Sequence, residues 1–447
     1  MKNEKHAESL KWYEKASGKH FSKKTEAGNT TSVQKKISPA KEFSPVETHH
    51  QQHNGPRSSI TLISSLFNAT ALPKDAVQAL NSFDKIISSS HPISSKQRAL
   101  LPQQIRELSH ELTDERYDRR LGYMNTTTTL SAYVYYYMWW NLVRLTKLFA
   151  NLPAESFKLD DKSICLDIGS GPLTVPVALF LSHPELRTKK LTWYCLDISS
   201  SALAAGEDIF LSTAAYLQCE PWKIIRVKGE MGTPIKEKAS FITCANVFNE
   251  IVEDIEMPPD YLAKKYGEKI LSYAIEQKKE TVSPPAQVLV IEPGIPKSAR
   301  FISLLRDALL RKEFIPQAPC THCGTCPMDG KKGGKWCNFA FSTDDAPLAL
   351  RKLSEASQLP KERAVLSFIL ATRAAKNVNS SDFTFRVASD PIRLPGERTG
   401  YYACSEKGLL LIVTQKKLFS GQSFKMKTPN RMTHIDAKSG AFVIDAE

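Results

Sequence analysis

The sequence predicts an α/β protein built on a doubly wound parallel sheet. Apolar runs of strand length alternate with helical segments through the middle of the chain. The expected strands are 163–168, 191–196, 223–228, 241–245 and 287–291, and the expected helices between them are 174–181, 200–217 and 261–277. This alternation places helices on both faces of a parallel sheet, where ligands bind at the carboxyl ends of the strands.

The first expected strand ends in a turn of small residues, Asp167-Ile168-Gly169-Ser170-Gly171. Its two glycines let the backbone turn sharply and approach a ligand, and the helix behind them offers unpaired N–H groups. The second strand ends in Asp197, where a carboxylate can accept hydrogen bonds from ribose hydroxyls. A purely structural turn is the alternative, but the acidic strand end favours a nucleoside pocket.

This constellation resembles the S-adenosylmethionine site of the class I methyltransferases. The residues that carry the resemblance are Asp167, Gly169, Ser170, Gly171 and Asp197. The resemblance implies that fold and that cofactor, and Asn246 at the end of the fourth strand is expected to line the same pocket. Those enzymes often have a third glycine where this chain has Leu173. The segment 246–250 lacks the Asn/Asp-Pro-Pro-aromatic motif of amine-methylating enzymes, so no catalytic residue is assigned.

The composition favours a polyanionic partner. The 447 residues carry a net charge of +13, which points to RNA first, although a solvated basic tail would give the same excess. We expect no DNA partner. We also expect no membrane span, because no apolar run reaches the roughly 18 residues that one requires. Acidic residues near the N-terminus argue against a mitochondrial transit peptide, so a bacterial cytoplasm is the first expectation and the mitochondrial matrix the second.

Four regions are expected along the chain: a disordered basic tail (1–57), a helical region (58–155), the α/β domain (156–345) and a C-terminal helical and β-rich module (346–447). Within the second region, residues 59–66 have helical spacing, and the aromatic run 130–140 is expected to pack in a core. Within the last, 346–375 is expected to be helical and 381–415 to form strands.

The α/β domain also contains a cysteine-rich insert at 318–340. Its cysteines are Cys320, Cys323, Cys326 and Cys337. In a reducing compartment, such density indicates metal binding rather than disulfides. The spacing Cys-x2-Cys-x2-Cys-Pro resembles half of a bacterial ferredoxin signature, in which thiolates hold an iron–sulfur cluster. A zinc site of four thiolates, or of three with His322, is the alternative, and four unliganded thiols are the remaining one.

Several blocks together resemble the small-ribosomal-subunit assembly family of mitochondria and bacteria that includes methyltransferase-like protein seventeen. The blocks are Cys320 with Cys326-Pro327, Trp336-Cys337-x-Phe339, the run 361–368, and Arg393-Leu394-Pro395 leading to Cys404. With the glycine turn, the resemblance covers about residues 100–415. The cysteine blocks are its most specific part.

The family resemblance implies a methyltransferase-like fold with a 4Fe–4S cluster. Carried over by position, the ligands are Cys320, Cys326, Cys337 and Cys404. Cys323 has no counterpart and is either a spare thiol or a substitute for one of the four, while a buried strand cysteine is the alternative for Cys404. The implied function is small-subunit assembly, with rRNA and ribosomal proteins as partners. An active S-adenosylmethionine-dependent RNA methyltransferase and a zinc-stabilised RNA-binding module remain as alternatives.

Overall fold

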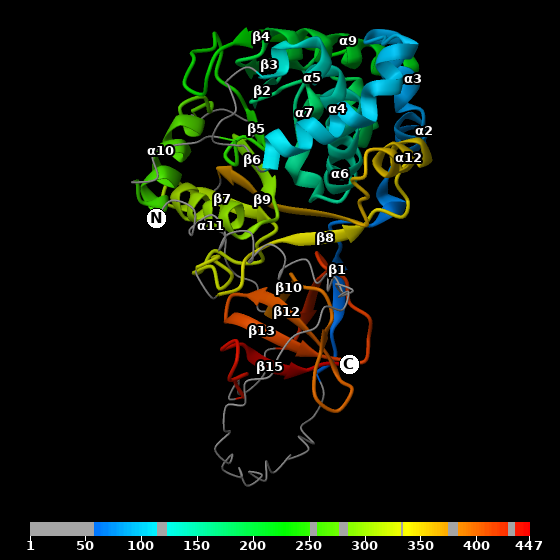
Figure 1. Cartoon of the computed structure of the whole chain (residues 1–447). Coiled ribbons are helices and arrows are strands. Elements are labelled where there is room, and N and C mark those ends of the chain that lie inside the picture. The colour runs from blue at the N-terminus through cyan, green and yellow to red at the C-terminus, as the bar shows by residue number, and fades with distance from the viewer. Residues whose placement is uncertain are drawn as a thin grey trace, which may run out of the picture. The chain divides into compact units, whose positions relative to one another are not determined.

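The structure is a computed structural model of the whole chain (Figure 1). The residues it describes are 58–113, 123–250, 257–276, 285–331, 334–373, 383–427 and 434–447. The expected disordered tail, residues 1–57, lies outside them. None of the described helices combines the length and apolar character needed to cross a membrane.

The larger sheet has eight strands in the order β4-β3-β2-β5-β6-β9-β7, with β8 paired to β9. They are β2 (Ile164–Ile168), β3 (Thr192–Asp197), β4 (Lys223–Lys228), β5 (Phe241–Ala245), β6 (Gln287–Pro293), β7 (Phe314–Ala318), β8 (Phe339–Ser342) and β9 (Arg363–Arg373). Strands β2 to β6 are parallel, whereas β9 runs antiparallel to β6 and β7. The strand order reverses at β2, which makes the carboxyl end of β2 the expected ligand position. All five strands expected in this region are confirmed.

Helices cover both faces of this sheet, as the alternating sequence pattern predicts (Figure 1). They are α7 (Thr174–Ser182), α8 (Pro184–Arg187), α9 (Ser200–Tyr216), α10 (Pro259–Leu271) and α11 (Pro296–Leu310). Cys165 of β2 packs in the core that α7 and α9 share, and its neighbour Leu166 packs in the core of α10 and α11. This division follows because successive side chains of a strand point to opposite faces.

The N-terminal region adds a layer of helices to the first of these cores. Its elements are η1 (Ala69–Ala71), α2 (Lys74–Asn81), α3 (Phe83–Ser90), α4 (Ser95–Thr113), η2 (Tyr123–Asn125), α5 (Thr127–Ala132), the π-helix η3 (Tyr133–Met138), α6 (Trp139–Phe149) and η4 (Ala154–Phe157). The aromatic run is buried here, as expected. The indole of Trp139 donates to the carbonyl of Leu80 at 3.0 Å, and that of Trp140 donates to Ser354 Oγ at 3.0 Å. These bonds satisfy the polar edges of two buried rings.

The second sheet has seven strands in the order β1-β14-β10-β12-β13-β15, with β11 paired to β12. They are β1 (Thr61–Ser64), β10 (Phe383–Val387), β11 (Ile392–Arg393), β12 (Thr399–Ser405), β13 (Gly408–Val413), β14 (Ser423–Met426) and β15 (Phe442–Asp445). The strands expected within 381–415 lie in this sheet. Its own core includes Phe383, Phe385 and Ile412.

Two sequence predictions are wrong. The first is the helix expected over 59–66, because Thr61–Ser64 instead forms β1 and pairs with β14 near the other end of the chain. Leu62 and Ile63 are both about half exposed in β1, whereas Ile60 and Leu66 near the two ends of the segment are buried. A partner so distant in sequence leaves no trace in local spacing.

The second is the helix expected over 346–375. Helix α12 ends at Ala356 (Leu348–Ala356), and Arg363–Arg373 is strand β9. β9 lies between β6 and β7, so the larger sheet extends beyond residue 345, the expected end of the α/β domain. A largely apolar run such as 365–371, interrupted only by Ser367, suits a buried strand and a buried helix equally well.

Candidate cofactor site and cysteine cluster

The glycine turn joins β2 to α7 at the point where the sheet reverses its strand order. Gly169 and Gly171 have φ angles of +66° and +51°. A Cβ built on Gly169 would lie 2.2 Å from Val247 Cγ2, so this position has no room for a side chain. The turn therefore requires glycine for its backbone conformation and for its close contact with the segment after β5.

Asp167 supports this turn from inside. Its Oδ2 accepts a hydrogen bond from Ser170 Oγ at 2.7 Å, and its Oδ1 accepts one from Thr243 Oγ1 at 2.7 Å. Burial raises the pKa of the Asp167 carboxyl to about 7. Both oxygens are thus used by hydroxyl groups of the protein, and the carboxyl connects β2 to β5.

Asp197 connects the turn to the end of β3. Its Oδ2 accepts from the N–H of Gly171 at 2.8 Å and its Oδ1 from the N–H of Ser199 at 2.8 Å. Burial raises the pKa of this carboxyl. A carboxylate offers about four lone-pair positions, so these two bonds leave acceptor capacity for a ribose hydroxyl.

Asn246 has a left-handed backbone, with φ of +59°, directly after β5. Its side-chain oxygen accepts from Arg144 Nη2 of α6 at 3.2 Å. The segment that follows is fixed by Glu292 of β6, whose buried carboxyl accepts from the N–H groups of Phe248 at 2.8 Å and Asn249 at 3.1 Å. Burial raises the pKa of Glu292 to about 8 and lowers that of Arg144 to about 10.

The N-terminal helices bring residues to this site that the sequence did not single out. Asn125 Oδ1 accepts from Ser199 Oγ at 2.8 Å, beside Asp197. Burial raises the pKa of the Tyr133 hydroxyl, and the charges of Glu250 and Asp197 raise it further, which places that ring near both carboxyls. The only local signal was aromatic clustering, which fits core packing equally well.

Leu173 occupies the position where a third glycine was expected. Its φ is +58°, a left-handed conformation that usually belongs to glycine, and its side chain is fully buried. The neighbouring contact is tight because a Cβ on Gly206 of α9 would lie 2.4 Å from the backbone of Pro172. The turn therefore packs closely against helix α9 because α9 has a glycine, Gly206, at the contact.

The four family-implied cysteines, from two distant segments, are linked by charge effects on their pKa values. Burial raises the pKa of the Cys337 thiol well above its usual range, and the charges of Cys326, Cys320 and Cys404 raise it further. The pKa of Cys404 is likewise raised by burial and then by the charges of Cys326 and Cys320. These mutual effects mark neighbouring thiols, since charges interact strongly only at short range.

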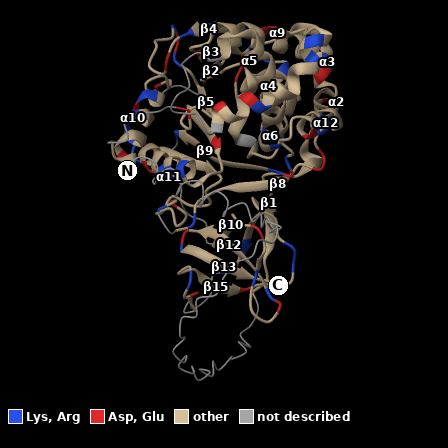
Figure 2. Cartoon of the chain, in the orientation of Figure 1, with Lys and Arg blue, Asp and Glu red and all other residues tan. Residues whose placement is uncertain are grey.

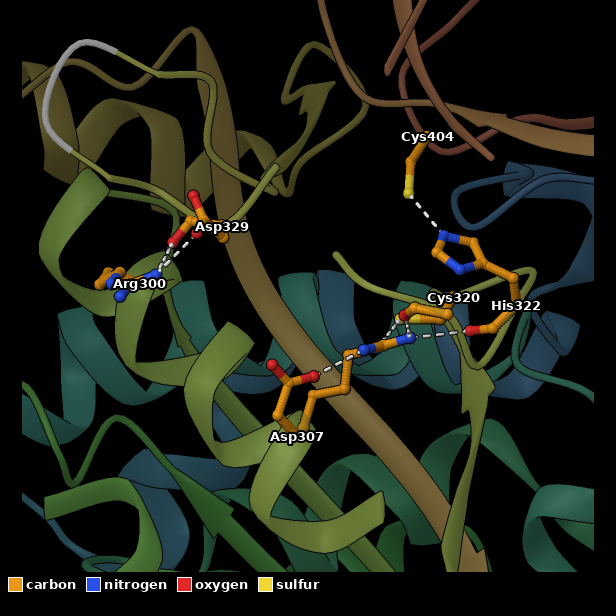
Figure 3. Close-up of polar contacts among 8 residues, drawn as sticks. Arg300, Asp307, Cys320, His322, Asp329 and Cys404 are labelled. Atoms are coloured by element: carbon orange, nitrogen blue, oxygen red, sulfur yellow. Dashed lines mark hydrogen bonds and ion pairs between the residues drawn. The ribbon is translucent and has the colours of Figure 1, made fainter. Parts of the chain in front are cut away.

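The folding of the insert explains this meeting. Cys320 follows β7, whereas Cys337 lies just before β8, where its N–H donates to Met328 O at 3.0 Å and its carbonyl accepts from Ser367 Oγ of β9 at 2.8 Å. Cys404 belongs to β12 of the second sheet. Figure 3 shows Cys404 directed at the imidazole of His322, whose Nε2 lies 3.3 Å from the sulfur.

Two buried arginines accompany the thiols. Arg306 of α11 donates from Nε to Cys320 Sγ at 3.3 Å, and Arg386 of β10 donates from Nε to the carbonyl of Pro319 at 2.6 Å. Burial lowers the pKa of Arg386 to about 10. The charges of Cys320, Cys337 and Cys404 raise this pKa and so offset part of the effect of burial. Burial alone would also lower the pKa of Arg306, but Cys320 and Cys326 raise it above its usual value.

Cys323 lies half-buried in the same loop. It is not among the largest charge effects on Cys320, Cys337 and Cys404. Over the described ranges, no group of three or more His, Cys, Asp or Glu side chains is arranged to hold a metal ion.

Basic residues are interspersed with acidic ones on the described elements (Figure 2). Helix α10, for example, carries Lys264, Lys265 and Lys269 next to Asp260 and Glu268. Although the chain has a net positive charge, the surface of α10 is of mixed charge.

Comparison with solved structures finds weak likenesses to methyltransferases. A class I S-adenosylmethionine-dependent methyltransferase from Listeria monocytogenes, itself described as putative, is 11% identical, with a TM-score of 0.30, covering 68% of this chain and 89% of its own. A SAM-dependent methyltransferase from Aquifex aeolicus is 14% identical, with a TM-score of 0.26, covering 49% and 87%. Geranyl diphosphate C-methyltransferase from Streptomyces coelicolor is 9% identical, with a TM-score of 0.27, covering 49% and 76%.

A search of curated proteins finds no match. The family model described as mitochondrial small ribosomal subunit Rsm22 matches residues 161–430. This range includes the glycine turn, the segment after β5 and all four clustered cysteines. With more than half of its length matched, the chain belongs to the mitochondrial small ribosomal subunit Rsm22 family.

Proposed function

We propose that this protein is an assembly factor of the mitochondrial small ribosomal subunit that carries a 4Fe–4S cluster and binds S-adenosylmethionine. The observation that carries the proposal is the contact between the insert and β12, where His322 Nε2 lies 3.3 Å from Cys404 Sγ, together with the charge effects of Cys320, Cys326 and Cys404 on Cys337. The family match supports the ribosomal role, with rRNA and ribosomal proteins of the small subunit as partners. The family description also supports the mitochondrial matrix over the bacterial cytoplasm that the N-terminal sequence favoured.

The residues around the four thiols suit an anionic iron–sulfur cluster. Arg306 and Arg386 are 2% and 8% exposed and supply positive charge. Thr321 Oγ1 is buried and has no hydrogen-bond partner among the described residues, so its hydroxyl could donate to a cluster sulfur. Cys320, Cys326, Cys337 and Cys404 would hold the cluster, and its contribution here would be structural. Metal binding of this kind adds directly to folding free energy.

The test of the cluster is iron and acid-labile sulfide analysis of anaerobically purified protein. We expect both elements in the wild type and near-complete loss in Cys337→Ser and Cys404→Ser. Cys323→Ser is the matched control in the same loop and should retain them. Finding zinc without labile sulfide would reject the iron–sulfur cluster and support a zinc-stabilised module. Full iron retention in Cys404→Ser would contradict the assignment of Cys404 as a ligand.

The glycine-turn site suits an adenosine-containing cofactor. Asp197 keeps acceptor capacity for the ribose, and the glycine turn lets a ligand approach the backbone at the switch point of the sheet. Gly169, Ser170, Gly171 and Asn246 would complete the site, with Asp167 supporting the turn. Bound S-adenosylmethionine would supply an activated methyl group, and no residue of this chain is assigned to its transfer.

Calorimetry with S-adenosylmethionine tests this half of the proposal. We expect binding by the wild type and a loss of at least tenfold in Asp197→Ala, whereas Asp161→Ala, on the amino side of β2, should bind normally. An absence of heat at millimolar ligand would reject the cofactor. Methylation of small-subunit rRNA by the purified protein would favour the active methyltransferase over a purely assembling role.

RNA binding is tested by its dependence on salt. If lysines and arginines contact rRNA phosphates, log K should fall linearly with log salt concentration. Affinity that is absent, or that does not change with salt, would contradict an rRNA contact through basic side chains.

A further inference from the structure

Arg306 and Arg386 reach the clustered thiols from two different sheets. Arg306 lies on α11 beside the larger sheet and bonds to Cys320 Sγ at 3.3 Å. Arg386 lies on β10 of the second sheet, where it is the cross-strand partner of Cys404. Directly opposed residues of an antiparallel pair project on the same face, so the register itself keeps this guanidinium beside the Cys404 sulfur.

The neutralisation of these two guanidiniums by carboxylates is incomplete. Arg306 pairs with Asp307, a residue of the same helix whose side chain is 40% exposed, and otherwise donates to the carbonyls of His322 and Gly324. Arg386 donates to the carbonyls of Pro319 and Gly421, and it forms no ion pair with a carboxylate in the part of the chain that the structure describes. A buried guanidinium without an anion is costly. The neighbouring cysteine sulfurs would supply that anion when they are deprotonated as cluster ligands.

We propose that Arg306 and Arg386 are positioning residues that offset the negative charge of the thiolate-held cluster and raise its reduction potential. The inference rests on the proposed function, because it takes Cys320, Cys326, Cys337 and Cys404 as cluster ligands. One-electron reduction adds a negative charge to the cluster, and fixed positive charges nearby stabilise the reduced state more than the oxidised state. A donor N–H on a ligand sulfur acts in the same direction.

The experiment is a potentiometric titration of the anaerobically purified protein with dithionite as the electron donor, followed by electron paramagnetic resonance. We expect the potential of Arg306→Met and Arg386→Met to be more negative than that of the wild type. Arg300→Met is the matched control, because Arg300 lies on the same helix but pairs with Asp329 at 2.9 Å (Figure 3). Its potential should equal that of the wild type.

Unchanged potentials in both Met variants, measured at full iron and sulfide content, would overturn the inference. If a Met variant loads no cluster, Gln and Lys variants of the same position are compared: Lys keeps the charge and Gln does not, so the Gln variant must have the lower potential, and equal potentials overturn the inference. A wild type without iron and sulfide would instead reject the proposed cluster itself, so the two failures are distinguishable.

A purely structural role for the arginines predicts a different pattern. Their bonds to carbonyl groups exist with or without a cluster, so a structural role would lower the melting temperature of the loaded and the chelator-treated protein equally. Charge compensation predicts that Arg386→Met destabilises the loaded protein by more than the chelator-treated one. Equal losses would count against the inference.

Discussion

Single residues at the glycine-turn site are fixed by hydrogen bonds that sequence spacing did not reveal. Asp167 was expected to contact the cofactor, yet both of its oxygens accept from Ser170 and Thr243. Asp197 was expected at the ribose and keeps that capacity while holding the N–H of Gly171. The two carboxyls at neighbouring strand ends thus differ in their partners, which are hydroxyl groups for Asp167 and backbone N–H groups for Asp197.

The buried Asp167 carboxyl predicts a pH dependence of stability. Burial raises its pKa from 3.8 to about 7, so the folded protein binds this proton more tightly than the unfolded chain does. The stabilisation is complete below about pH 4 and is lost as the pH rises through 7. Asp167→Asn removes the ionisation and can keep both bonds, because hydroxyls donate and accept.

We therefore expect Asp167→Asn to be more stable than the wild type at pH 8, by up to about 4 kcal/mol, and the two to differ less at pH 5. Urea unfolding at the two pH values measures this. If the free energy of unfolding of Asp167→Asn differs from that of the wild type by the same amount at pH 5 and at pH 8, the raised pKa of Asp167 is contradicted. Asp161→Asn, on the surface loop before β2, is the control.

At the scale of elements, the connection from β2 to α7 depends on contact with the segment after β5. That contact is between Gly169 and Val247, and Glu292 holds the same segment from β6. Three parallel strands thereby fix one turn. The turn was visible in the sequence, but the partner that makes glycine necessary was not.

Gly169→Ala should destabilise the protein by about 1–3 kcal/mol, because it adds a left-handed alanine and a Cβ that would lie 2.2 Å from Val247 Cγ2. Thermal unfolding measures the loss. In Gly169→Ala/Val247→Ala the clash is absent, so the double variant should cost less than the sum of the single ones. Additive losses would show that the backbone conformation alone requires glycine.

Helix α6 is tied to the segment before α12 by a buried ammonium. Lys147 Nζ lies 2.6 Å from Asp345 Oδ2 and 4.7 Å from the ring centre of Phe341. The Lys147 side chain is 6% exposed and that of Asp345 is 49% exposed. The two partners are therefore not equivalent.

Removing Asp345 should cost more than removing Lys147. Asp345→Ala leaves a buried ammonium without its anion, which costs about 1–3 kcal/mol, whereas Lys147→Met leaves a carboxylate that water can solvate. Chemical denaturation of both variants and of the double variant Lys147→Met/Asp345→Ala measures the difference. Equal losses in the two single variants would contradict this asymmetry.

At the scale of the whole described unit, the cysteine insert contacts the second sheet, since His322 Nε2 lies 3.3 Å from Cys404 Sγ. Cys320 follows β7 of the larger sheet and Cys404 belongs to β12 of the second, with the Arg386–Pro319 bond alongside. A centre bound there would contribute to the stability of both sheets.

Metal removal by a chelator should therefore lower the melting temperature and expose the loop 318–340 to proteolysis. The expected scale is about 1–2 °C for each kcal/mol of binding free energy lost, because the entropy of unfolding grows with chain length. Cys337→Ser, Cys404→Ser and their double variant should melt alike, because loss of one ligand already removes the centre. Further loss in the double variant would indicate separate structural roles for the two thiols.

The sequence by itself determined the parts of the fold that local periodicity encodes. The five parallel strands, the helices between them and the glycine turn appear as expected, because buried strands and amphipathic helices have their own spacing and length. The burial of Trp139 and its aromatic neighbours followed in the same way. The family resemblance pointed to the four cysteines, and the Rsm22 match bears out the family.

Only the tertiary structure decided which distant segments meet. β1 pairs with β14, β9 enters the larger sheet between β6 and β7, and Cys404 reaches the insert. Strand pairing is a property of two segments, so neither segment alone reveals its partner. Spacing likewise gave no sign of Arg306 and Arg386, because a guanidinium becomes a partner of a thiol only when the fold removes both from water.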